Sequence, residues 1–201
     1  MCVGLAPCLR AECQTNASEA ADVQGVNVET LVCVRHGEKP KAGLGQLSCR
    51  GLNRSLALPR VLLSKFPRPE FVFAPNPNQK SESNTFYYVR PLVTIEPTAI
   101  QCGLPVNTQF GFKEITGLEA ELLKERYKSA TVYIAWEHSL LDVFAKDMVR
   151  NLGGDPAKVP PWASEDFDSI FVLRITTTPA GKTVRFAIDH EGLNNLSDQC
   201  P

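Results

Sequence analysis

Two histidines in this chain directly follow apolar runs, and an arginine lies beside the first of them. The run "LVCV" (31–34) leads into Arg35 and His36, and "TVYIAW" (131–136) leads, after one glutamate, into His138. The chain has only three histidines, so two in equivalent positions favour one shared site over two unrelated loop residues. An arginine keeps its charge in a protein, and burying it unpaired is costly. Arg35 is therefore expected to reach a surface or a negatively charged ligand.

Histidines and arginines at one place are suited to phosphoryl transfer. A histidine can attack phosphorus to form a phosphohistidine, while arginine N–H groups bind the equatorial oxygens. If enough positively charged side chains surround the phosphoryl group, no metal ion is required. Neither "RHGE" nor "WEHS" has the HxH or HExxH spacing of a metal site. A serine nucleophile is disfavoured because no GxSxG elbow occurs. The third histidine, His190, lies between Asp189 and Glu191 and is expected to be exposed rather than functional.

Composition and charge limit the class of protein. The chain has 201 residues, 43% of them hydrophobic and 21% charged, as expected for one soluble globular domain. A net charge of −1 gives no electrostatic basis for binding nucleic acid or an anionic membrane. No apolar run approaches the length of a membrane span. The expected partner is therefore a substrate rather than a nucleic acid or a lipid bilayer.

Apolar runs alternate with helical patterns along the chain. Strands are predicted over 31–34, 71–74 and 131–138, helices over 47–66, 117–127 and 139–153, and a hairpin over 169–190. Ser48 is the predicted N-cap of the first helix and Gly153 the end of the last. Pro91 and Pro97 oppose one continuous helix over 87–102. The pattern predicts an α/β fold: a three-layer α/β/α sandwich with a mostly parallel central sheet and a C-terminal antiparallel hairpin.

The first 27 residues are predicted to precede the domain, which spans 28–201. Cys2, Cys8 and Cys13 lie in this leader, whose opening resembles the tail of a signal peptide. Two interpretations stay open: the remnant of a signal peptide, which implies a periplasmic or secreted protein with paired cysteines, and a simple N-terminal extension of a cytoplasmic one. Cys33, within the first apolar run, is expected to be a core residue. Spacing alone does not predict which cysteines pair.

The motifs together resemble the histidine phosphatase superfamily, also called the phosphoglycerate mutase-like family, in its branch of small bacterial phosphatases. "RHGE" after a short apolar strand resembles the family signature, and "LSCRGLNRSLAL" (47–58) resembles the opening of its first helix. The segment 90–106 is similar to the stretch from the second arginine to Gly-Leu-Pro-Val, and 132–153 to the strand, second histidine and helix that complete the pocket. The resemblance covers roughly residues 29 to 190.

The resemblance implies a role for each matching residue. His36 corresponds to the nucleophile, and Arg35, Arg90 and His138 to the groups that bind the phosphoryl group. His138 is also expected to stabilise the transition state. Thr94 matches a threonine four residues after the second arginine. Arg50 and Arg54 are expected to lie on a solvated helix face.

Two departures from the family pattern concern the substrate and the proton donor. An insertion separates Pro75 from Arg90, so that the loop 76–89 is interpreted either as a lid or substrate wall, with Lys80, Ser81 and Asn84, or as a disordered insertion. The glutamate that often precedes Phe-Gly is absent from "VNTQFGFKEITG" (106–117), and Glu114 is the nearest candidate for the general acid. An equally weighted interpretation makes Glu114 a charge at the start of the next helix.

The resemblance implies a metal-independent phosphatase, without a cofactor, that hydrolyses a phosphomonoester of a small molecule or a phosphoprotein through a phosphohistidine. The phytase-like branch is disfavoured, because Ser139 replaces the aspartate expected after the second histidine. One alternative is a phosphoglycerate mutase-like phosphotransferase, for whose shielding cap the chain offers little length. Another is a non-catalytic phospho-ligand-binding homologue, which the uncertain general acid allows.

Overall fold

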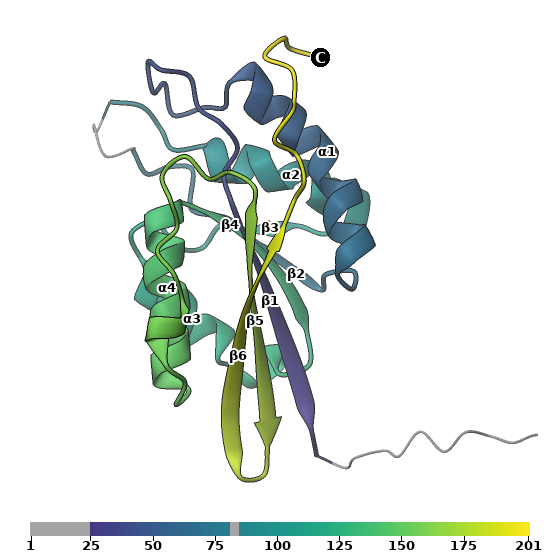
Figure 1. The fold of residues 1–201 in the computed structure, drawn as a ribbon, viewed down its shortest axis with the longest axis vertical. Coiled ribbons are helices and arrows are strands. Elements are labelled where there is room, and N and C mark those ends of the chain that lie inside the picture. The colour runs from purple at the N-terminus through teal and green to yellow at the C-terminus, as the bar shows by residue number, and fades with distance from the viewer. Residues whose placement is uncertain (1–24, 81–84) are drawn as a thin grey trace, which may run out of the picture.

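The structure, a computed structural model, describes residues 25–80 and 85–201 (Figure 1). Most of the predicted leader, including Cys2, Cys8 and Cys13, lies outside the described residues, as do Ser81 and Asn84 of the predicted insertion. The strands are β1 (Asn27–Arg35), β2 (Phe71–Phe73), β3 (Val106–Asn107), β4 (Thr131–Trp136), β5 (Ser169–Thr178) and β6 (Gly181–His190). The helices are α1 (Cys49–Lys65), α2 (Arg90–Cys102), α3 (Ile115–Leu122) and α4 (His138–Asn151), with 3-10 turns at Glu125–Tyr127 and Pro156–Lys158.

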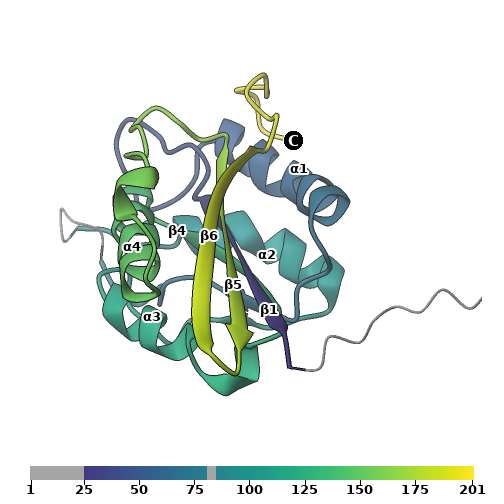
Figure 2. The same cartoon turned by 60° about the horizontal axis from the view of Figure 1, so that its bottom comes forward.

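The strands form one mixed sheet in the order β3-β2-β4-β1-β5-β6. The pairs β3-β2, β2-β4 and β4-β1 are parallel, whereas β5 runs antiparallel to both β1 and β6. Helices cover both faces, α1 and α2 on one side and α3 and α4 on the other (Figure 2). The predicted α/β/α sandwich with a C-terminal antiparallel hairpin is therefore confirmed.

The central part of β1, Leu31 to Val34, is apolar because both faces of the sheet are covered there. Alternate side chains of a strand point to opposite faces. Leu31 and Cys33 accordingly pack in the core beneath α3 and α4, and Val32 and Val34 in the core beneath α1 and α2. Cys33 is buried with a free thiol, as its place in the apolar run predicted.

Local signals set the ends of two helices. Ser48 caps α1, as predicted, with its hydroxyl oxygen accepting the Gly51 N–H at 3.2 Å. Helix α4 ends at Asn151, and Gly153 follows with a φ of 77°, a conformation that favours glycine. The helix predicted over 117–127 is wrong in extent. It ends at Leu122 and passes into a 3-10 turn, where the Tyr127 hydroxyl donates to Glu121 at 2.9 Å.

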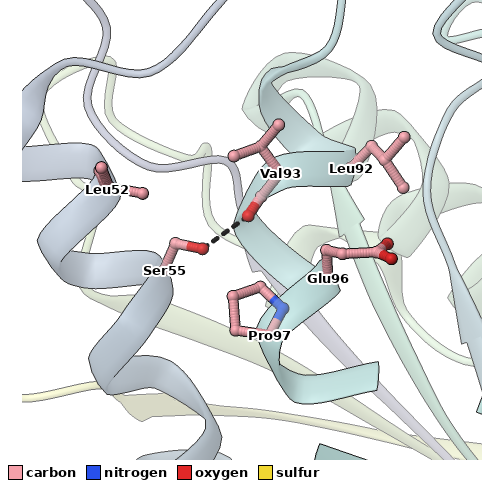
Figure 3. Close-up of a pocket in the computed structure, with 6 residues that line it drawn as sticks. All are labelled: Leu52, Ser55, Leu92, Val93, Glu96 and Pro97. Carbon is pink, nitrogen blue, oxygen red and sulfur yellow. Dashed lines mark hydrogen bonds between the residues drawn. The ribbon is translucent and has the colours of Figure 1, made fainter. Parts of the chain in front are cut away.

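The prediction that two prolines would interrupt residues 87–102 is wrong, because α2 is continuous from Arg90 to Cys102. Pro91 lies in the first turn, where a backbone N–H has no partner within the helix. Pro97 leaves the carbonyl of Val93, four residues earlier, without its usual helical donor. Ser55 of α1 replaces that donor: its hydroxyl donates to the Val93 carbonyl at 2.5 Å (Figure 3). A tertiary hydrogen bond therefore compensates for the second proline.

The C-terminal tail lies along α1 and is covalently joined to its start. A disulfide links Cys49 to Cys200, a pairing that the sequence had left open. The Asn53 amide donates to the carbonyls of Ser197 and Gln199 at 3.0 and 2.8 Å. No helix within the described part of the chain is long and apolar enough to cross a membrane.

Candidate active site

The two predicted histidines leave neighbouring parallel strands at the same edge of the sheet. Arg35 of β1 pairs in register with Trp136 of β4, and the backbone N–H of His36 donates to the Trp136 carbonyl at 3.0 Å. The chain after Trp136 turns directly into α4, whose first residue is His138. Because both strands end at this level, His36 and His138 start from adjacent positions, as the sequence predicted.

His36 is a buried, neutral imidazole with a defined tautomer. Its Nδ1 lies 2.8 Å from the Gly37 carbonyl, which can only accept, so Nδ1 carries the proton and Nε2 keeps its lone pair. Burial lowers the pKa of His36 to about 3, the charges of Arg90 and Arg35 act in the same direction, and the Gly37 hydrogen bond opposes them. At neutral pH, Nε2 is therefore available as a nucleophile.

Glycines allow the loop after His36 to pack closely against α1. A Cβ on Gly37 would lie 2.9 Å from the Gly51 carbonyl oxygen, and a Cβ on Gly51 would lie 2.3 Å from that of Glu38. The Gly37 N–H donates to Thr94 Oγ1 at 2.9 Å, and the Thr94 hydroxyl donates to the carbonyl of Arg90 at 2.8 Å. These contacts connect the loop after His36 to the start of α2 through the Thr94 hydroxyl.

The two predicted arginines are each held over an aromatic ring. Arg35 Nη1 donates to the carbonyls of Ser164 and Asp166 at 2.6 and 2.8 Å, and its Cζ lies 3.8 Å from the centre of the Phe167 ring. Burial lowers the pKa of Arg35 from its ordinary value, and the Glu137 carboxylate opposes this. The guanidinium is therefore fixed in place by the loop that precedes β5.

Arg90 is held in a similar way. Its Nη1 donates to the Gly43 carbonyl at 3.1 Å, and its Cζ lies 4.5 Å from the centre of the Tyr88 ring. Stacking on an aromatic face suits the planar guanidinium and leaves its other N–H groups free to bind an oxyanion. The first residue of α2 thus presents a preorganised cation beside His36.

Tyr88 and Phe167 are aromatic neighbours of His36 that the sequence did not reveal. The rings of Tyr88 and Phe167 lie 5.9 and 6.4 Å from the His36 ring. Tyr88 comes from the predicted insertion, and the only signal for it is its position two residues before Arg90. Burial raises the pKa of its hydroxyl, so Tyr88 remains a neutral donor. The insertion therefore contributes a side chain to the surroundings of His36.

Three residues near His36 each have a buried donor without a partner. The Nε atoms of Arg35 and Arg90 and the hydroxyl of Tyr88 are inaccessible to solvent and have no hydrogen-bond partner among the described residues. Buried polar groups are nearly always satisfied in folded proteins, so unpaired donors at one place indicate a missing acceptor. Two guanidinium groups and a phenol around a neutral imidazole fit a tetrahedral oxyanion. Over residues 25–80 and 85–201, no three His, Cys, Asp or Glu side chains gather as a metal site would require.

His138 is paired with the glutamate that precedes it. Glu137 is the N-cap of α4 and accepts the Leu140 N–H at 3.0 Å. Its Oε1 lies 2.5 Å from His138 Nδ1. Burial alone would raise the pKa of Glu137, but His138, Ser139 and the Leu140 N–H together lower it to about 2. Glu137 is therefore ionised at neutral pH.

Glu114 lies apart from the hydrogen bonds that organise the pocket. It is exposed at the N-cap of α3, and its carboxylate accepts the Gly111 N–H at 2.8 Å, in the turn before the helix. Its proposed role as general acid stays a prediction. His190 is exposed, as expected, with Nδ1 3.7 Å from a carboxylate oxygen of Asp168.

The expectation that Arg54 lies on a solvated helix face is wrong. Its side chain is 1% exposed and donates from Nε and Nη2 to both carboxylate oxygens of Glu38, at 3.0 and 2.8 Å. Nη1 donates to Glu191, and Nη2 also donates to the Leu193 carbonyl at 3.1 Å. Arg50 is partly exposed and pairs with Asp198 at 2.8 Å. Arg54 is buried because it binds two carboxylates, one from the loop after His36 and one from the residue that follows β6.

Solved structures with the same fold are histidine phosphatases and phosphoglycerate mutases. A protein described as a candidate phosphohistidine phosphatase SixA, from Nakamurella multipartitia, is 17% identical with a TM-score of 0.56, covering 83% of this chain and 98% of that one. A protein histidine phosphatase SixA complexed with tungstate is 16% identical, with a TM-score of 0.54 and coverage of 81% and 97%. A phosphoglycerate mutase from Plasmodium falciparum is 10% identical, with a TM-score of 0.53 and coverage of 80% and 89%.

These likenesses show that the chain shares the fold of solved histidine phosphatases and of a phosphoglycerate mutase, as the resemblance of its motifs predicted. No family model and no curated protein sequence matches the chain. At these identities the comparisons establish the fold alone. The reaction has to be argued from the pocket.

Proposed function

We propose that the protein is a phosphatase that hydrolyses a phosphomonoester, of a small molecule or a phosphoprotein, through a phosphohistidine at His36. The observation that carries this proposal is the set of unpartnered donors from Arg35, Arg90 and Tyr88 around a buried, neutral His36. Such a set would bind the oxygens of a phosphoryl group and present Nε2 to its phosphorus. The tungstate bound by one SixA of the same fold is also a tetrahedral oxyanion, which supports this use of the pocket.

The reaction takes place in two steps. In the first, His36 Nε2 forms a bond to phosphorus while the bond to the leaving oxygen breaks. Arg35, Arg90 and His138 bind the phosphoryl oxygens, whose charge they stabilise more strongly in the transition state than in the substrate. In the second, water attacks phosphorus, the P–N bond breaks, and the electron pair returns to Nε2. Hydrogen bonding of Nδ1 to the Gly37 carbonyl keeps the reactive nitrogen unprotonated in both steps.

A covalent intermediate provides the direct test. Enzyme that is acid-quenched during turnover of a phosphomonoester should carry a phosphate that is labile in acid and stable in base. His36→Ala should carry none and should lack turnover. Full turnover by His36→Ala would contradict the mechanism, and oxyanion binding without turnover by the native protein would favour the non-catalytic alternative.

The substrate class is open to a parallel screen. Phosphorylated metabolites and phosphopeptides, including phosphohistidine peptides, would be compared with native enzyme and His36→Ala. Release of inorganic phosphate distinguishes a phosphatase from a mutase, which would return the phosphoryl group to an organic acceptor. We expect net release of phosphate.

We also propose that the protein works in an oxidising compartment. The Cys49–Cys200 disulfide supports this, because disulfides persist mainly in secreted and periplasmic proteins. It favours the signal-peptide interpretation of the first 27 residues. Peptide mapping of protein isolated from its native source without reductant should recover Cys49 joined to Cys200, and free thiols at both positions would contradict the proposal.

A further inference from the structure

The glutamate of "WEHS" contributes a carboxylate to a pocket that is otherwise built for an anion. Glu137 affects the ionisation of Arg35, His36 and Tyr88, the groups that surround the proposed phosphoryl site. A negative charge there repels a phosphate dianion and by itself weakens substrate binding. We therefore expect the Glu137 carboxylate to have a function that outweighs the weaker binding of substrate.

The contacts of Glu137 indicate that this function concerns His138. Oε2 accepts the Leu140 N–H at 3.0 Å and the Ser139 hydroxyl at 2.5 Å, which anchors the carboxylate at the start of α4. Oε1 is left for His138 and lies 2.5 Å from its Nδ1. That nitrogen is buried and makes this ion-pair contact, but no hydrogen bond, in the described part of the chain. The carboxylate is thus fixed by the helix and directed at one nitrogen of one histidine.

The two ring nitrogens of His138 explain why it needs such a partner. Without a fixed partner, the imidazole could present either ring nitrogen to the site. An ionised carboxylate against Nδ1 sets the ring so that Nδ1–H faces Glu137. Nε2 is then the nitrogen that is free to exchange a proton with a substrate.

We propose that Glu137 is a positioning residue that makes His138 the general acid and base of the reaction. This inference rests on the proposed phosphatase function. As the P–O bond breaks, His138 Nε2–H transfers its proton to the leaving oxygen, which departs as an alcohol. In the second step water adds to phosphorus and gives a proton to His138 Nε2, while the P–N bond breaks and His36 regains its electron pair. Glu137 stays ionised throughout, and the cycle ends with His138 protonated again.

The proposal predicts an effect of Glu137→Gln that depends on the leaving group. An alkyl phosphate has a poor leaving group and requires a proton as its P–O bond breaks, whereas p-nitrophenyl phosphate has a good one and does not. In Glu137→Gln, kcat/KM for the alkyl phosphate should fall on the order of 100-fold, the lower end of what general acid catalysis contributes. The value for p-nitrophenyl phosphate should stay within about three-fold of native, since kcat/KM reports only the steps through phosphorylation.

A second readout follows the loss of the general base. Hydrolysis of the phosphohistidine should slow in Glu137→Gln, so acid-quenched enzyme should hold more phosphate during turnover of p-nitrophenyl phosphate than native enzyme does. Glutamine can still accept the Leu140 N–H, so the cap of α4 is retained. Equal loss of kcat/KM for both substrates, without accumulation of phosphoenzyme, would show that Glu137 only supports the fold and would overturn the proposal.

Two further variants complete the experiment. Asp147→Asn removes a carboxylate that pairs with Arg150 on the same helix, and should leave both kcat/KM values unchanged. Glu114→Gln tests the general acid expected from the family pattern, and a leaving-group-dependent loss there, but not in Glu137→Gln, would also overturn the inference. Failure of the proposed function is separate: in that case native enzyme would form no phosphohistidine with either substrate.

Discussion

The guanidinium of Arg54 donates to both carboxylate oxygens of Glu38 while also donating to Glu191. Glu38 ends the "RHGE" motif, and Glu191 immediately follows β6, so one buried side chain connects the catalytic loop to the C-terminal hairpin. The loop that follows the proposed nucleophile is therefore supported from α1 as well as from α2, where Thr94 binds Gly37.

Arg54→Met should destabilise the protein by about 3 kcal/mol, because it leaves the Glu38 and Glu191 carboxylates without their cation in a buried place. Chemical denaturation at neutral pH would measure the change in the free energy of unfolding. In a double-mutant cycle with Glu38→Gln, the coupling free energy should be about 1 kcal/mol or more. A loss below about 0.5 kcal/mol in Arg54→Met, which is typical of a surface substitution, would restore the solvated-face interpretation.

The low pKa of His36 predicts how stability depends on pH. Its pKa is about 3 in the folded protein, below the ordinary value of 6.5, so between these values the unfolded chain binds more protons at this position. This contribution to stability is fully present above pH 6.5 and decreases as the pH falls toward 3. The free energy of unfolding of native protein should therefore fall more steeply over this range than that of His36→Gln. If the unfolding free energies of the native protein and of His36→Gln changed with pH in parallel, the pKa of His36 would not be lowered by folding. That outcome would contradict the prediction.

The part of the site that could be predicted from sequence depends on local patterns. The apolar runs before Arg35 and before Glu137 predict strands, and parallel strands bring their carboxyl ends to one edge whatever the rest of the chain does. His36 and His138 could therefore be placed together without knowledge of the sheet order. Of their neighbours, Arg35 and Glu137 follow from the same short segments.

The parts that could not be predicted depend on partners far away in the sequence. Arg54 is buried by Glu191, 137 positions later, and the carbonyl that Pro97 leaves free is satisfied by Ser55 of another helix. Tyr88 reaches the pocket only because the insertion folds back, with its N–H donating to the Gln79 carbonyl at 2.8 Å. The residues next to Arg54, Pro97 and Tyr88 in the sequence show no periodicity or spacing that would indicate these distant partners.

Activity should survive chelation. In the proposed mechanism, the guanidinium groups of Arg35 and Arg90, together with the imidazole of His138, stabilise the transferring phosphoryl group in place of a metal ion. After long incubation with EDTA and removal of the chelator, the rate should equal that of untreated enzyme. Loss of activity that a divalent ion restores would require a metal site and contradict this prediction.

The disulfide should contribute substantially to stability. It closes a sequence separation of 151 residues between Cys49 and Cys200, and a crosslink over so long a loop restricts the unfolded chain. Cys49→Ala/Cys200→Ala should lower the free energy of unfolding by about 2–4 kcal/mol. Reductant should lower the thermal midpoint of native protein but not that of the double variant. A double variant as stable as native protein would show that the noncovalent contacts of the tail are sufficient.

Arg90→Lys should lose most of its activity while staying folded. Lysine cannot reproduce the planar fork of the guanidinium or its stacking on Tyr88, where Arg90 Cζ lies 4.5 Å from the ring centre. Because the charge on the equatorial oxygens must be held in the transition state, kcat should fall more than KM rises, by on the order of 100-fold. Vanadate, which resembles the transferring phosphoryl group, should bind more weakly.

Arg50→Lys, which alters an arginine paired with Asp198 at the surface, is the matched control and should behave as native enzyme. Native kinetics in Arg90→Lys would mean that the assignment of Arg90 across the 76–89 insertion is wrong.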